Sequence, residues 1–82
     1  MTNSEYYQTS DTAMATYLLI EGYTLMDIDY SNPRYEFYFK NDGGILDKSQ
    51  KYMTGNALVD PAVYQRINRR LSRVIKEKGL WR

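Results

Sequence analysis

Five basic residues in the last quarter of the chain have a spacing that suits phosphate binding. They recur mostly three or four positions apart, and they are Arg66, Arg69, Arg70, Arg73 and Lys76. Residues at these offsets lie on one side of an α-helix, where their charges can follow a row of phosphates. We therefore predict that DNA or RNA binds this side, with Arg70 at its flank. The alternative is a solvated helix face whose charges keep a small protein soluble or pair with the acidic N-terminal third.

A second candidate surface is the polar side of a strand that contains Tyr38. Tyr38 lies between Arg34 and Lys40, and its ring could stack on the bases of a single-stranded nucleic acid. Neighbouring carboxylates argue against this use because they repel phosphate; they are Glu36, Asp27 and Asp29. The alternative is ordinary cross-strand pairing of opposite charges.

Two further patterns fall short of a chemical site. Asp27 and Asp29 are two residues apart on a strand and could share a divalent cation or act as an acid/base couple, but no third ligand or pocket is marked. The alternative is that Asp27 and Asp29 are ordinary solvent-facing acids of a strand. The turn Asp42-Gly43-Gly44 lacks the Lys-Ser or Lys-Thr that follows in a phosphate-binding loop.

The residue types that are missing narrow the function further. The 82 residues include no His and no Cys, which removes the commonest metal ligands, the usual general base and the thiol nucleophile. We expect no enzyme activity, no metal site and no cofactor. The longest apolar run, Tyr17 to Ile20, is too short to cross a membrane, and the first residues do not form a secretion signal. A cytoplasmic protein without membrane contact is expected.

The basic residues belong to a helix expected over Asp60 to Lys78. Asp60 is a favourable N-cap, Pro61 fits the first helical position, and Gly79 is expected to end the helix. Its opposite side is apolar, with Tyr64, Ile67, Leu71, Val74 and Ile75 at helical spacing.

The first half of the chain predicts a helix followed by a β-hairpin. Thr9-Ser10-Asp11 is a helix start signal, in which a hydroxyl side chain is expected to cap the helix and the acid to lie in its first turn. The helix is expected to run to about Glu21 and to be stopped by Gly22. In the first strand, Met26, Ile28 and Tyr30 are expected on one face, with Leu25, Asp27 and Asp29 on the other. A turn at Ser31-Asn32-Pro33 leads to a second strand, in which Tyr35, Phe37 and Phe39 alternate with the polar side that includes Tyr38.

Three segments allow two interpretations. Tyr6-Tyr7 fits a third strand or a loose arm, and residues 45–52 fit a short helix or an irregular segment. Trp81 is either an exposed aromatic anchor for a partner or a side chain that folds back over the core.

These elements make a single α+β domain over residues 1–82, in which the C-terminal helix packs on one face of the sheet. Charge is divided along the chain: residues 1–31 hold five acidic and no basic residues, and residues 61–82 hold seven basic residues and one acidic residue. Because a small sheet has open edges, we expect a homodimer through the edge strands or the last helix.

Several apolar and turn positions resemble a known family. They are Thr9-Ser10-Asp11, Ala15, Leu18-Leu19, Gly22-Tyr23, the run from Arg34 to Phe39, and Leu58-Val59-Asp60-Pro61. Over roughly Tyr6 to Ile75 the chain resembles small proteins of bacteriophages, prophages and other mobile elements of Gram-positive bacteria, catalogued as a domain of unknown function. The resemblance implies a phage or mobile-element origin and brings no activity and no functional residue.

Two functions follow from the sequence. The first is a small non-enzymatic accessory protein that binds nucleic acid through the basic side of the last helix, with Tyr38 in a secondary role. The second is a protein-interaction module that binds and modulates a host or phage protein. The net charge of +1 mildly favours the second, since dedicated DNA binders usually carry a larger positive excess.

Overall fold

The computed structural model describes residues 5–31 and 33–81. The elements along the chain are β1 (Tyr6–Thr9), α1 (Thr12–Ile20), β2 (Leu25–Asp29), β3 (Glu36–Lys40), α2 (Ile45–Met53) and α3 (Pro61–Glu77). This arrangement confirms the α+β class and its C-terminal helix. It also shows that residues 6–9 form a strand and that residues 45–53 form a helix, which settles two of the open alternatives.

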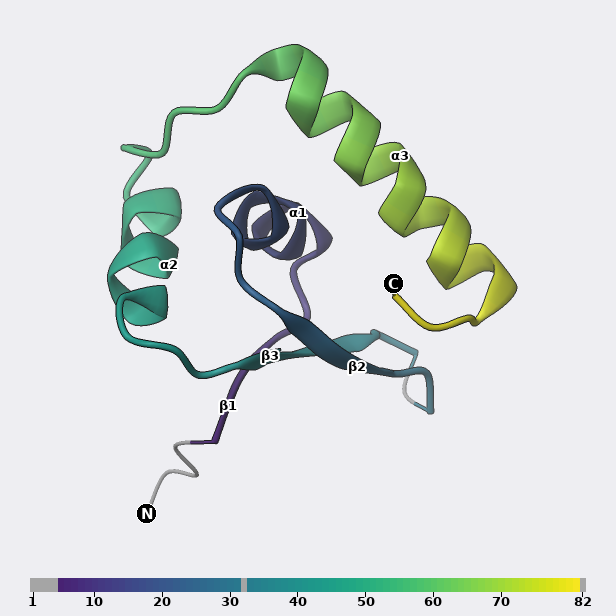
Figure 1. Ribbon diagram of the computed structural model, residues 1–82. Coiled ribbons are helices and arrows are strands. Elements are labelled where there is room, and N and C mark those ends of the chain that lie inside the picture. Colours follow the sequence, from purple (N-terminus) through teal and green to yellow (C-terminus); the bar gives the residue numbers. More distant parts are fainter. Residues whose placement is uncertain (1–4, 32, 82) are drawn as a thin grey trace.

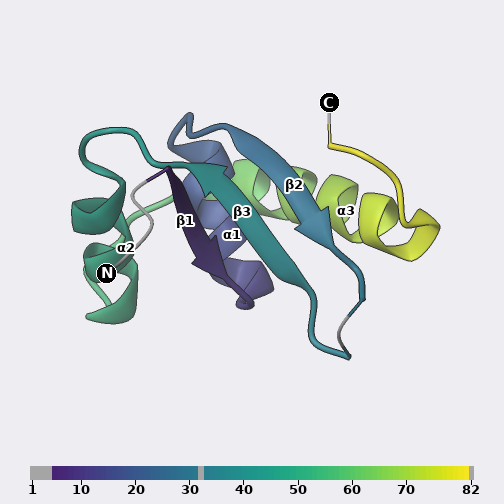
Figure 2. The same cartoon turned by 90° about the horizontal axis from the view of Figure 1, so that it is seen from below.

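The strands form an antiparallel sheet in the order β1-β3-β2, so β3 is central. The helices lie on one side of this sheet, with α1 between α2 and α3 (Figure 1). Seen from below, the three strands lie in front of α1 and α3 (Figure 2). The fold therefore has two layers, and in the described part of the chain no helix covers the second face of the sheet.

The core fills the space between the sheet and the helices. Phe37 and Phe39 of β3 are fully buried. Residues two positions apart on a strand point to the same face, and here that face is the one covered by the helices. The two phenylalanines meet the buried helical side chains Met14 and Leu18 of α1, Ile45 of α2 and Leu71 of α3. α3 packs chiefly against α1, so α1 makes most of the contact between α3 and the rest of the domain.

The expected facing of β2 is wrong at its first two residues. Leu25 is buried with 6% of its surface exposed, whereas Met26 is 51% exposed. An irregularity in the pairing of β2 with β3 between Leu25 and Asp27 explains the difference. An extra residue in one strand reverses the facing of what precedes it, so Leu25 and Ile28, three positions apart, both reach the core.

Helix ends differ from the expectation in two places. Asp11, and not a hydroxyl residue before it, caps α1, because its carboxylate accepts hydrogen bonds from the backbone N–H of Ala13 and Met14. At the other end of the chain, Lys78 takes the left-handed conformation (φ 52°, ψ 41°) in which α3 stops, so the stop comes one residue before Gly79. In the turn between β2 and β3, Asn32 lies outside the described residues.

A candidate nucleic-acid interface

α3 presents its basic residues to solvent because its other side is anchored. Asp60 accepts hydrogen bonds from the backbone N–H of Ala62 and Val63, and Pro61 occupies the first turn, as expected. Leu71 is fully buried, which fixes the rotation of the helix about its axis. The opposite side of α3 must then face away from the core.

Four cations follow this outer side, and we call them the α3 stripe: Arg66, Arg69, Arg73 and Lys76, all of them exposed. At a rise of 1.5 Å per residue the stripe is about 15 Å long. Across residues 5–31 and 33–81, no acidic side chain forms an ion pair with any of the four. Their charges are therefore available to an external anion.

Arg70 lies beside the stripe and has a different role. Its guanidinium carbon is 4.4 Å from the centre of the Trp81 ring, within the range of a cation–π interaction. Trp81 is half-buried and packs against the core, so the chain after α3 folds back. This decides between the two interpretations of Trp81 and makes Arg70 a residue that positions the C-terminal segment.

The structure places Tyr38 on a different surface from the α3 stripe. Tyr38 alternates with the buried Phe37 and Phe39, so its side chain points to the sheet face opposite the helices. There its ring contacts Tyr6 of β1, with ring centres 6.1 Å apart and planes at 89°. Tyr38 and α3 therefore do not form one continuous surface.

The carboxylates of Asp27 and Asp29 each accept a hydrogen bond from a nearby backbone N–H. Asp27 accepts a hydrogen bond from the N–H of Ile28 at 2.8 Å. Asp29 accepts from the hydroxyl of Ser31 at 2.6 Å and from its N–H at 2.9 Å, and these bonds lower the pKa of Asp29. In the part of the chain that is described, no group of three acidic, His or Cys residues could hold a metal ion.

The turn at Asp42-Gly43-Gly44 leads directly into α2, which is the helical one of the two alternatives for residues 45–52. Gly44 caps α2 in the left-handed conformation (φ 92°), which glycine adopts without strain. The first turn of α2 carries Asp47, whose negative charge opposes phosphate binding at this helix N-terminus.

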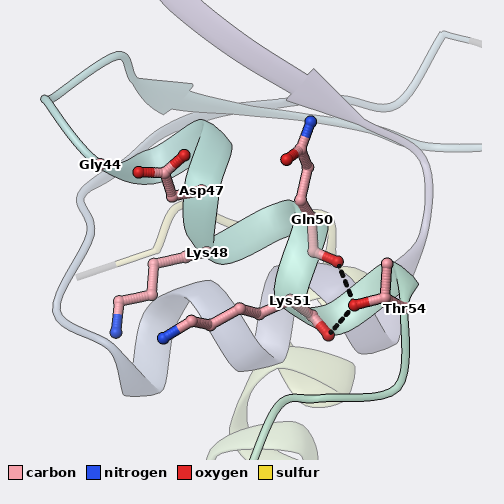
Figure 3. A pocket seen from close by; sticks show the side chains of 6 residues that line it. All are labelled: Gly44, Asp47, Lys48, Gln50, Lys51 and Thr54. Carbon is pink, nitrogen blue, oxygen red and sulfur yellow. Dashed lines mark hydrogen bonds between the residues drawn. The ribbon is translucent and has the colours of Figure 1, made fainter.

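The outer side of α2 carries an open hollow of about 510 Å³ (Figure 3). Lys48 and Lys51 extend to the same side of the helix, whereas Gln50 points the other way. The ammonium group of Lys48 is 3.0 Å from the carboxylate of Glu21, and this hydrogen bond raises the pKa of Lys48. Of the two lysines, Lys48 is therefore already engaged within the domain.

Sequence reasoning missed the sheet-face hollow next to Tyr38. Tyr6, Met26, Asp27 and Tyr38 line it, with a volume of about 480 Å³. Because Met26 was expected in the core, the sequence did not predict that it lies next to Tyr38. The available signal was the spacing of Leu25 and Ile28, which fits one buried face only if the strand contains a bulge.

The helices among residues 5–31 and 33–81 are too short or too polar to span a lipid bilayer. Comparison with curated proteins and with solved structures found no match. Comparison with family models found one match, a domain of unknown function (DUF5659), over residues 4–77. Because this match covers most of the chain, the protein belongs to the DUF5659 family.

Proposed function

We propose that this protein is a non-enzymatic accessory protein that binds nucleic acid through the α3 stripe. The observation that carries the proposal is the row of four exposed cations, none of which pairs with an acid in residues 5–31 and 33–81. Phosphate contacts of this kind depend on charge and supply sequence-independent affinity. Arg70 contributes at the margin of the surface, since its charge remains next to the stripe while it holds Trp81.

Charge removal on α3 tests this proposal. The double substitution Arg69→Gln with Arg73→Gln keeps good helix formers and removes two central charges of the stripe. Fluorescent single- and double-stranded DNA and RNA should bind the unaltered protein at low salt, and the variant should bind each sequence more weakly by a similar factor. Lys48→Gln with Lys51→Gln is the matched control on α2, and it should bind nearly as well as the unaltered protein.

We do not include Tyr38 in the proposed nucleic-acid surface, because it lies next to Tyr6 on the sheet face that points away from the helices. Tyr38→Leu should leave nucleic-acid affinity unchanged. Equal binding by the α3 double variant and the unaltered protein would contradict the role of α3. Binding that Tyr38→Leu removes would move the site to the sheet.

A protein-interaction module is the second candidate function, and exposed apolar side chains favour it. Leu58, between α2 and α3, is 90% exposed, and Met53 at the end of α2 is 70% exposed. Exposed apolar side chains are typical of protein–protein contact sites when they gather in one patch. Absence of nucleic-acid binding at low salt would make this function the better account, with a host or phage protein as partner.

We further propose a phage or mobile-element origin, action in the host cytoplasm, and a homodimer. β1 is the edge strand that supports dimer formation best, because the C-terminal residues Leu80 and Trp81 border β2. Sedimentation equilibrium measures the oligomeric state directly. A monomer at high protein concentration would contradict the dimer without bearing on the α3 stripe.

A further inference from the structure

The uncovered sheet face has a hollow that the α3 stripe does not use. Tyr6 of β1, Met26 and Asp27 of β2 and Tyr38 of β3 line it, so each strand contributes. Figure 2 shows the three strands of this face in front of the helices. Tyr6 is 40% exposed and Met26 is 51% exposed, which is high for large apolar side chains. The bulge in β2 brings Met26 to this surface, and Asp27, the register partner of Tyr38, lines the same hollow.

The two tyrosine rings stand at right angles and form a corner. Their centres are 6.1 Å apart, and their planes meet at 89°. The face of an aromatic ring attracts a cation through its quadrupole, and rings that enclose a cationic head group from two directions are a recurring way to bind it. The polarisable thioether of Met26 adds an adaptable apolar contact for the stem of a long side chain.

Charges on this face favour a cation over an anion. Asp27 lines the hollow, and Asp29 pairs with Glu36 in the register of β2 and β3, so these carboxylates share the face of Tyr38. The opposing charges are Arg34 before β3 and Lys40, the register partner of Tyr6. Neither lines the hollow, and the ammonium group of Lys40 lies 3.9 Å from the carboxylate of Asp42. Phosphate would be repelled here, whereas a positively charged side chain would be attracted.

We propose that this hollow binds an arginine side chain from a basic segment of a partner protein. The guanidinium stacks against the tyrosine corner and pairs with Asp27, and its alkyl stem lies along Met26. Arginine is the preferred cation because its planar group stacks on aromatic faces and is less strongly hydrated than an ammonium group. This inference goes beyond the proposed function: it concerns the opposite face of the domain and does not depend on nucleic-acid binding.

A short peptide tests the site directly. The probe is acetyl-Gly-Arg-Gly-amide, followed by backbone amide NMR shifts of the ¹⁵N-labelled protein at low salt. Saturable shifts are expected at Tyr6, Met26, Asp27 and Tyr38. The same peptide with citrulline in place of arginine has the same shape without the charge, and it should bind at least about threefold more weakly.

Variants identify the groups that bind. Tyr38→Leu should weaken the arginine peptide about three- to fivefold, whereas Tyr38→Phe keeps the ring and the affinity. Asp27→Asn keeps an acceptor for the N–H of Ile28 and removes the charge, which should weaken binding about twofold. Arg69→Gln with Arg73→Gln should leave peptide binding unchanged, which separates this site from the α3 stripe.

Several results would overturn the proposal. Equal binding of the arginine and citrulline peptides, or shifts confined to other residues, would show that the hollow does not recognise the cation. Shifts at the hollow with an oligonucleotide would assign the sheet face to nucleic acid instead. Shifts at these four residues when the protein alone is diluted would show that a second copy of this chain occupies the face.

Discussion

Lys78 is the residue whose backbone conformation fits its type least well. Its φ of 52° lies in the left-handed region, and among the described residues other than glycine it alone has a positive φ. The helix stop uses this conformation, with the N–H of Lys78 donating to the carbonyl of Ile75 and that of Gly79 donating to Val74. A side chain at such a position costs about 1–2 kcal/mol relative to the right-handed region.

Replacement of this residue by glycine should therefore stabilise the protein. We expect Lys78→Gly to raise the free energy of unfolding by about 0.5–1 kcal/mol, because relief of strain exceeds the added entropy of the unfolded chain. Urea unfolding followed by circular dichroism measures the change. Lys76→Gly, inside the helix, is the matched control and should lower stability by about 1 kcal/mol. An equal loss in both variants would contradict the assignment of the stop to residue 78.

Tyr30 joins the end of β2 to the end of α3. Its hydroxyl donates to the carbonyl of Gly79 at 2.8 Å, and it lies 3.4 Å from the carbonyl of Val74. Tyr30→Phe should keep the contact of the ring with Tyr35 and lose the hydrogen bond, at a cost of about 1 kcal/mol. Thermal unfolding measures this cost, and Tyr6→Phe on the exposed sheet face should show almost none.

Alkaline pH should destabilise the domain. Burial raises the pKa of Tyr17, Tyr30 and Tyr52 above the ordinary value of 10.0. A raised pKa in the folded state gives stability that is complete below the unfolded value and lost as pH rises through the folded value. We therefore expect the free energy of unfolding in urea to fall from pH 9 to pH 11. A constant value over this range would contradict the burial of these hydroxyl groups.

At the scale of elements, the local signals of α3 were sufficient to predict it. Asp60, Pro61 and the apolar period gave its start and its buried side, and the structure confirms both. α1 was located from the sequence signals at its two ends. Residues 14–18 are buried on every side of the helix, so no polar face marks it in the sequence. Residues 45–53 could not be assigned, since Gly44 is an unusual helix start whose left-handed backbone is visible only in the structure.

The bulge in β2 was not predicted, because regular alternation also explains residues 26–30 and only the pairing with β3 shows the extra residue. Because of the bulge, two neighbouring apolar residues should differ strongly in their contribution to stability. Leu25→Ala should lower the free energy of unfolding by about 2–4 kcal/mol, because it leaves a cavity beside the core. Met26→Ala should change it by less than about 0.5 kcal/mol. Chemical denaturation of both variants tests this, and a larger loss for Met26→Ala would restore the regular alternation.

At the scale of the whole molecule, the exposed cations of α3 and the tyrosines of the uncovered sheet face lie on different surfaces. α3 carries exposed cations on the helical side, and the uncovered sheet face carries Tyr6 and Tyr38 among carboxylates. The sequence predicted the exposure of the α3 stripe, since helical periodicity places charges opposite the apolar residues. It also placed Tyr38 on the polar sheet face, as a surface separate from α3. It did not show that Met26 lies next to Tyr38 there, because that depends on the bulge in β2.

The most direct test of the α3 stripe is the salt dependence of binding to duplex DNA. With one phosphate per cation, the slope of log affinity against log salt is about −3.6, so affinity should fall about 150-fold between 50 and 200 mM salt. Arg69→Gln with Arg73→Gln leaves two contacts, and its affinity should fall only about 12-fold over this range. The same steep loss in both proteins, or no binding by either at 50 mM salt, would contradict nucleic-acid binding through α3.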